Sequence, residues 1–148
     1  MVKNIDHVTV AVRDLAAAKQ FFAVLGFREE TSVVISGPTM ERYMAIPGLE
    51  ADHVTLVLDG ASPRFEIQLL RYRAPEAHVD PFIGRLDKLG YNHVCFAVAD
   101  LDAELANLRG HGVRVLNDVM AFHDRRLVYL AGPEGITVEL AEWGSRSA

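Results

Sequence analysis

The chain has 148 residues, half of them apolar, with a formal net charge of −5 and a single cysteine. The acidic balance, with no basic cluster larger than RYR or DRR, argues against a nucleic-acid partner. No apolar run is long enough to span a membrane, no export signal opens the sequence, and one cysteine excludes an internal disulfide. We therefore expect a cytoplasmic protein without nucleic-acid or membrane partners.

The first half of the chain reads as a strand, a helix and three further strands. Residues 4–12 are expected to form the first strand, after which the carboxylate of Asp14 can cap a helix over residues 15–25. Gly26 supplies the stop at the end of that helix. The other strands are expected in FREETSVVI, HVTLVLD and RFEIQLLRY, and the polar segment SGPTMERYMAIPGLEAD is expected to form in part a loop over one face.

The second half repeats this order. Aligning His7 with His93 gives nine identities in twenty-two positions without a gap, which indicates a duplicated module. Its helix is expected after Asp100, and its strands are expected in YNHVCFAV, VRVLN, RRLVYLA and ITVELAEW.

The repeat sets the predicted architecture. The class is α+β, with two paired βαβββ modules forming a curved mixed sheet around a metal-binding cleft. We expect a single domain over residues 1–148, with module 1 at about 4–72, a linker at about 73–89 and module 2 at about 90–143. A short helix is expected in the linker after Pro81.

Strand parity sorts the side chains onto two faces, because successive residues of a strand point to opposite sides of the sheet. In each half one face carries large apolar residues suited to packing under a helix, and the other is small or polar. The polar faces carry His7, Gln68, His93 and Glu139, with Glu66 as a weaker alternative to Gln68.

These polar groups need partners, since burying an unpaired one costs about 1–3 kcal/mol. One divalent transition metal (Zn, Ni, Co, Mn or Fe) would satisfy imidazole nitrogens together with amide and carboxylate oxygens. A lone strand histidine is more often a core or rim residue than a ligand. The equivalent repeat positions of His7 and His93 favour the ligand interpretation.

The remaining histidines and the cysteine carry weaker signals. His53, His78 and His111 read as solvent-facing or structural. His123 lies in the loop that enters the penultimate strand and could line the mouth of the cleft. Cys95 reads as a small packing residue beside the site rather than as a nucleophile, because nothing cationic other than a metal-bound neighbour would lower its pKa.

Three stretches resemble the vicinal-oxygen-chelate superfamily, which includes glyoxalase I, methylmalonyl-CoA epimerase, extradiol dioxygenases and the fosfomycin and bleomycin resistance proteins. HVTVAVRDLAAAKQFFAVLGF is similar to its N-terminal signature, GYNHVCFAVAD to its second signature, and VYLAGPEGITVEL to its terminal segment. Phe22, Asn92 and Gly132 depart from the residues usual at their positions in these motifs. The resemblance covers nearly the whole chain.

The resemblance implies a metal held by His7, Gln68, His93 and Glu139. The order His-Gln-His-Glu is most similar to the epimerase set, whereas bacterial glyoxalases usually have Glu at the second place. Extradiol dioxygenases bind Fe(II) through two His and one Glu, which His7, His93 and Glu139 could also supply. A third alternative is a resistance protein that sequesters a drug without catalysis.

The interpretation we favour is a metal-dependent lyase, isomerase or epimerase that acts on a small oxygenated carbonyl or acyl thioester through an enediolate. Glu139 is the first candidate for the proton shuttle, followed by Glu66 and Glu50. We also expect a homodimer.

Substrate recognition is expected at the mouth of the cleft. The polar segment of the first half contributes Arg42, Tyr43 and Met44. Facing it, Arg126 is the expected anion contact, ahead of its neighbour Arg125, because it begins a strand. The full set of residues expected to bind substrate is His123, Arg126, Tyr129 and Cys95.

Overall fold

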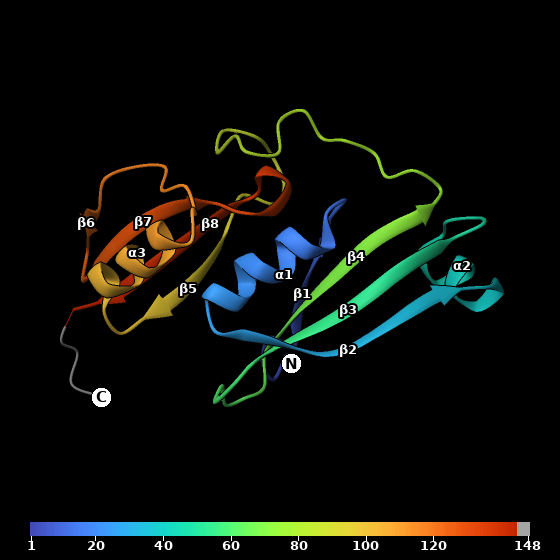
Figure 1. Cartoon of the computed structure of the whole chain (residues 1–148), viewed down its shortest axis with the longest axis horizontal. Helices are drawn as coiled ribbons and strands as arrows, with labels where there is room; N and C mark the ends of the chain where they lie inside the picture. Colours follow the sequence, from blue (N-terminus) through green and yellow to red (C-terminus); the bar gives the residue numbers. More distant parts are fainter. Residues whose placement is uncertain (145–148) are drawn as a thin grey trace. The chain divides into compact units, whose positions relative to one another are not determined.

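The computed structural model describes residues 1–144 and divides into two compact units, residues 1–79 and the part of the chain that starts at Asp80 (Figure 1). Unit 1 contains β1 (His7–Ala11), α1 (Leu15–Val24), β2 (Phe27–Ser36), α2 (Pro38–Met44), β3 (Glu50–Leu58) and β4 (Glu66–Ala74). Unit 2 contains β5 (Val94–Val98), α3 (Leu101–Gly110), β6 (Met120–Phe122), β7 (Arg125–Ala131), the short 3₁₀ helix η1 (Pro133–Gly135) and β8 (Thr137–Trp143).

Each unit contains one four-stranded mixed sheet. The strand order is β1-β4-β3-β2 in unit 1 and β5-β8-β7-β6 in unit 2, so the first strand of each unit lies beside its last and runs parallel to it. The other pairs are antiparallel. The α+β class and the repeated βαβββ order are confirmed. The single-domain description stays a prediction.

Helices α1 and α3 begin in the same way. The Asp14 carboxylate accepts a hydrogen bond from the Ala17 amide at 3.0 Å, and the Asp100 carboxylate accepts one from the Ala103 amide at 3.0 Å. Each cap satisfies an amide that the first helical turn leaves without a partner, as the sequence predicted. Beyond α1, Gly26 has φ +99°, a conformation in which a side chain would be strained.

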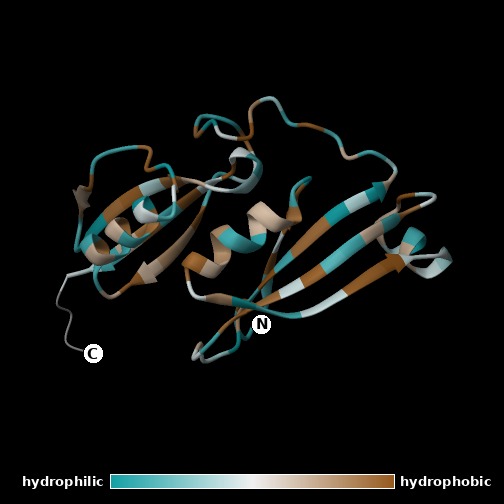
Figure 2. Ribbon diagram, in the orientation of Figure 1, coloured by the Kyte–Doolittle hydropathy of each residue, from teal (hydrophilic) through white to brown (hydrophobic). Residues whose placement is uncertain are grey.

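Alternating hydropathy places the core between each helix and one face of its sheet (Figure 2). In unit 1 this core includes Val10, Phe22, Leu56, Ile67 and Leu69, all buried. In unit 2 it includes Leu101, Leu105, Leu108, Leu130 and Leu140. The opposite face of each sheet, which we call the polar face, is therefore free to carry other chemistry.

Three local features differ from the sequence prediction. The segment after β2 contains the helix α2, which packs Met40 and Met44 against Leu49 and Leu70. The stretch after Pro81 forms hydrogen-bonded turns instead of a helix. The stretch VRVLN makes only an isolated bridge, between Val115 and Leu130, and the edge strand of unit 2 is β6. Nowhere in residues 1–144 is a helix long and apolar enough to cross a membrane.

Candidate metal centre

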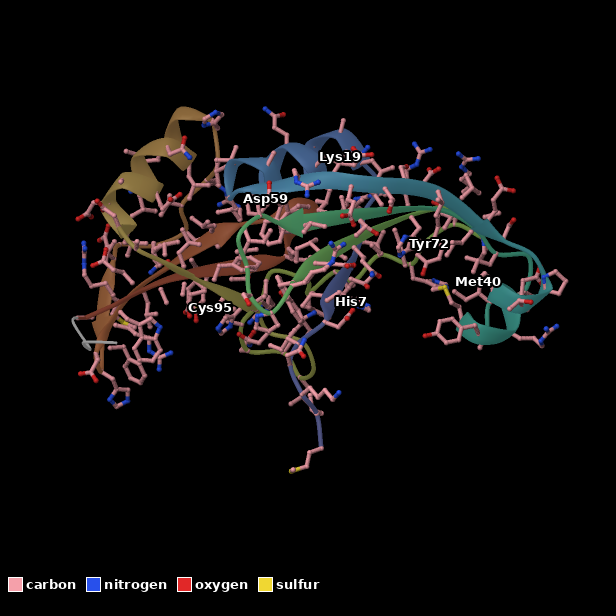
Figure 3. All side chains as sticks on the ribbon, turned by 90° about the horizontal axis from the view of Figure 1, so that it is seen from below. His7, Lys19, Met40, Asp59, Tyr72 and Cys95 are labelled. Atoms are coloured by element: carbon pink, nitrogen blue, oxygen red, sulfur yellow. The ribbon has the colours of Figure 1, made fainter. Side chains whose placement is uncertain are left out.

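The polar face of unit 1 brings the predicted ligands of the first module onto neighbouring strands. In the parallel register of β1 and β4, His7 lies opposite Glu66 and Thr9 lies opposite Gln68. Because residues that face each other in register share a side of the sheet, all four point to the same face. Figure 3 shows His7 on the side of the sheet away from α1.

The polar face of unit 2 repeats this arrangement. Cys95 lies opposite Glu139 in the register of β5 and β8, and His93 directly precedes β5. Thr9 and Cys95 each follow their histidine by two residues, so Gln68 and Glu139 occupy the same place in the two modules. The structure thus assigns equivalent positions to an amide and a carboxylate, both oxygen donors.

Both histidines have one ring nitrogen held by the residue before them. The Nδ1 of His7 lies 2.6 Å from Oδ2 of Asp6, and the Nδ1 of His93 lies 2.7 Å from Oδ1 of Asn92. An oxygen acceptor hydrogen-bonded to Nδ1 keeps the proton on that nitrogen and leaves the lone pair of Nε2 free. Metal-binding imidazoles are usually supported in this way. Asp6 and Asn92 were not predicted to support the histidines, although each directly precedes one in the sequence.

Within unit 2 the two candidate ligands face each other. Nε2 of His93 lies 3.8 Å from Oε1 of Glu139, and their side chains are 29% and 11% exposed. Two ligand atoms bound to one ion with bonds of about 2.1 Å are separated by about 3–3.5 Å. A small movement would therefore allow both atoms to bind one ion, and the donor set suits a divalent transition metal.

Gln68 is held by a chain of polar contacts on the polar face of unit 1. Its amide NH₂ group donates to Oε1 of Glu66 at 3.1 Å, and its Oε1 lies 3.1 Å from Nε2 of His53. Arg64 in turn donates to Glu66 at 2.8 Å and also pairs with Glu30. These contacts fix which amide atom is the oxygen. His53, read from the sequence as solvent-facing or structural, is half-buried beside a candidate ligand.

The alternative catalytic carboxylates lie in different surroundings. Both oxygens of Glu66 are engaged, one by Gln68 and the other by Arg64, which makes Glu66 an anchor for the amide. Glu50 begins β3 opposite Ala74, whereas Gln68 lies opposite Thr55. The Glu50 side chain is about half exposed and pairs with Arg73. The structure therefore does not bring Glu50 to the candidate ligands.

A pocket of about 310 Å³ opens on the polar face of unit 2. It is lined by His93, Asn117, Met120, Phe122, Arg125, Leu127, Val128, Tyr129 and Glu139. Tyr129 lies opposite Glu139 in register, with its ring edge-on to His93 at 5.2 Å between centroids. This volume is at the lower end for small-molecule sites, and the lining mixes apolar side chains with a few polar groups.

The two basic candidates at the β6–β7 hairpin, Arg126 and His123, are not among the residues that line the pocket of His93 and Glu139. Arg126 lies opposite Glu142 and pairs with it and with Asp102 of α3, on the helix side. The expected anion contact is therefore neutralised on the face away from Glu139. His123 occupies the turn between β6 and β7 at φ +51° and lines a second depression of about 430 Å³ at the hairpin tip.

Cys95 and Tyr129 are kept in their neutral forms. Partial burial and the neighbouring Glu139 carboxylate raise the pKa of the Cys95 thiol to about 12. Burial and the same carboxylate raise the pKa of the Tyr129 hydroxyl above its usual value. A thiol that stays protonated at neutral pH is a poor nucleophile, in keeping with the sequence interpretation of Cys95.

Each unit presents two of the four predicted ligands. Within the stretch from residue 1 to residue 144, no three His, Cys, Asp or Glu side chains converge in a metal-binding arrangement. The two-ligand sets, which we call half-sites, are His7 with Gln68 and His93 with Glu139.

The fold and the repeated half-sites agree with the comparisons. The chain belongs to the glyoxalase/bleomycin resistance protein/dioxygenase superfamily, whose family model matches residues 6–129. This confirms the resemblance identified from the sequence motifs.

Three relatives span almost the whole chain. An ethylmalonyl-CoA/methylmalonyl-CoA epimerase from Cereibacter sphaeroides is 29% identical over 96% of this chain and 99% of its own length. The uncharacterised protein YaeR of Escherichia coli K12 is 26% identical over 95% of this chain and 97% of its own. The crystal structure of a glyoxalase family protein from Bacillus cereus matches with a TM-score of 0.85 at 28% identity, covering 98% and 99% of the two chains.

Proposed function

We propose that the chain is a divalent-metal-dependent epimerase, isomerase or lyase that moves a proton at a carbon next to a carbonyl or thioester group. The observation that carries this proposal is the repeated half-site: a histidine with Nδ1 already held, and an oxygen donor at the matching position of the last strand. The 29% identity to an ethylmalonyl-CoA/methylmalonyl-CoA epimerase supports the same reaction class.

In this proposal the metal ligands are His7, Gln68, His93 and Glu139, and the metal is Zn, Ni, Co, Mn or Fe. Such an ion would supply Lewis-acid chemistry, which makes a C–H group next to a carbonyl or thioester more acidic. Asp6 and Asn92 keep the imidazoles in the binding tautomer. We also propose that the protein acts as a cytoplasmic homodimer on a small-molecule substrate.

Glu139 is the residue we assign to the proton. Its carboxylate is nearly buried, lies on the pocket wall and faces the ring of His93, so an oxygen of Glu139 can accept a proton from a carbon held in the pocket. Glu66 cannot take this role while Arg64 and Gln68 engage both its oxygens. Protonated Tyr129 beside Glu139 can donate a hydrogen bond to a substrate oxygen.

The test uses methylmalonyl-CoA and ethylmalonyl-CoA in D₂O with protein purified without chelator and then loaded with each metal. We expect solvent deuterium to appear at the α-carbon without consumption of O₂, in protein that holds close to one metal equivalent. Stoichiometric O₂ uptake with a catechol would instead establish an Fe(II) dioxygenase. Protein that gains less than about a tenth of an equivalent would be a metal-free binding protein.

Replacing His53 by alanine is expected to weaken metal binding by about 10- to 100-fold, the usual effect of losing a residue that supports a ligand. Without His53, the Gln68 amide keeps only its contact with Glu66 and can rotate. Competitive chelator titration would measure the change. His78→Ala removes an exposed histidine of the same unit and should leave the affinity unchanged. Equal affinities in the two variants would show that His53 does not support the site.

A further inference from the structure

Arg125 is the one pocket residue whose charge the proposed chemistry does not use. It lies on the polar face of unit 2, opposite Trp143 on β8 and Phe122 on β6. Its guanidinium stacks over the Trp143 ring at 4.3 Å from the centroid. Its Nε is buried and has no hydrogen-bond partner within residues 1–144. A buried guanidinium N–H without an acceptor is costly, and Arg125 also lines the pocket, so an anion bound there would stabilise this side chain.

The contrast with the adjacent residue supports this interpretation. Arg126 points to the other face of the same strand and is paired with Asp102 at 2.9 Å and Glu142 at 3.3 Å. Within the described part of the chain, Arg125 has no such carboxylate. The two consecutive arginines therefore differ. Carboxylates of unit 2 neutralise the charge of Arg126, whereas the charge of Arg125 is available to a ligand.

The lining of the pocket sets the shape of the ligand. Arg125, Leu127 and Tyr129 are successive residues on one face of β7, so the α-carbons of the first and last are about 13 Å apart. His93 and Glu139 lie at the Tyr129 end, while Met120, Phe122 and Leu127 supply apolar surface toward Arg125.

We propose that Arg125 binds a carboxylate at the far end of the substrate, separated from the reacting carbons at His93 and Glu139 by an apolar or aromatic segment. The planar guanidinium matches the two oxygens of a carboxylate, and stacking on Trp143 holds its plane in place. The substrate class is therefore a carboxylic acid with an apolar body and an oxygenated carbonyl end. The location of the reacting end rests on the proposed function.

The carboxylate contact can be tested on metal-free protein, independently of any reaction. Trp143 is the only tryptophan of the chain, so intrinsic fluorescence reports on the ring beneath Arg125. The probes are 4-phenylbutanoate and its uncharged counterpart 4-phenylbutanamide, with inorganic phosphate as a competing anion. We expect the acid to bind at least about tenfold more tightly than the amide.

Two substitutions at Arg125 and one at its neighbour make the test specific. Arg125→Gln should abolish the preference for the acid, Arg125→Lys should keep part of it, and Arg126→Gln should keep all of it. Equal affinity for acid and amide in the unaltered protein would overturn the proposal, as would a full preference in Arg125→Gln. Phosphate that binds more tightly than the acid would overturn the carboxylate assignment.

The outcomes also separate this inference from the metal assignment. If Arg125→Gln loses the acid preference but still binds metal, the carboxylate contact stands whatever the reaction proves to be. If metal binding fails in the unaltered protein while the acid preference persists, the proposed function falls and the anion subsite remains.

Discussion

Replacing His93 by alanine is expected to remove the metal and lower turnover by about a hundredfold or more. His93 supplies a ring nitrogen facing Glu139 at 3.8 Å, and its other nitrogen is already held by Asn92. With alanine at position 93, Glu139 is the only ligand left in that half-site. Metal analysis of the purified variant, together with deuterium incorporation into methylmalonyl-CoA, would measure both losses.

The matched control for this variant is His111→Ala. His111 is exposed and its ring contacts the backbone carbonyl of Asn107 at the end of α3, so its loss should change neither metal content nor turnover. If His93→Ala keeps a full equivalent of metal, the ion is bound elsewhere and the assignment of ligands is wrong. Loss of metal in both variants would point to general unfolding instead.

Replacing Phe22 by alanine should destabilise unit 1 by about 3–5 kcal/mol, the usual cost of truncating a buried phenylalanine. Phe22 is completely buried, and its ring packs edge-on against Phe21 at 5.1 Å and Phe27 at 5.8 Å between centroids. Truncation removes apolar area from the core and leaves a cavity between α1 and the sheet.

Urea denaturation would measure this loss as a lower midpoint with an unchanged slope. Tyr43→Ala is the control, because Tyr43 is 83% exposed on α2. The free energy of unfolding of this variant should stay within about 0.5 kcal/mol of that of the original protein. A Phe22→Ala variant as stable as the Tyr43 control would mean that the core between α1 and the sheet is misplaced.

The face of the sheet on which each candidate residue lies could be predicted from the sequence, through strand parity. The alternation of large apolar and polar residues identified the faces correctly, because burial under α1 and α3 leaves no choice of side for residues such as Ile67 or Leu140. The register then places Gln68 and Glu139 at matching positions. The alignment of His7 with His93 reveals the internal repeat, and the match of Gln68 with Glu139 comes from their places in the last strand of each module.

What parity could not supply was the identity of contacts across strands. The contact of His53 with Gln68 depends on the pairing of β3 with β4. The sequence of either strand alone gives no reason to place the two residues side by side. The structure pairs Arg126 with Glu142 and Asp102 on the helix side, whereas Arg125 shares the face of Tyr129, because one residue along a strand moves a side chain to the other face.

Segments with weak periodicity were also beyond prediction. Helix α2 has seven residues, starts at a proline after Gly37 and has no fully buried residue, so no apolar stripe marked it. The stretch VRVLN has strand-like composition, but only Val115 makes a bridge, and the edge of the sheet is formed by the three residues of β6. Composition alone cannot decide which segment reaches a sheet edge.

The long edge strand of unit 1 has a consequence for handling the protein. In the part of the chain that the structure describes, β2 pairs on one side only, with β3. Its first residues include Arg28, Glu29 and Glu30, charges that discourage another chain from adding to the edge. The six residues that follow, TSVVIS, carry no charge and no proline, and they include Val33 and Val34, which are 53% and 49% exposed. Such a segment has the composition of a self-associating strand, so concentrated or partly unfolded samples will aggregate through this edge first.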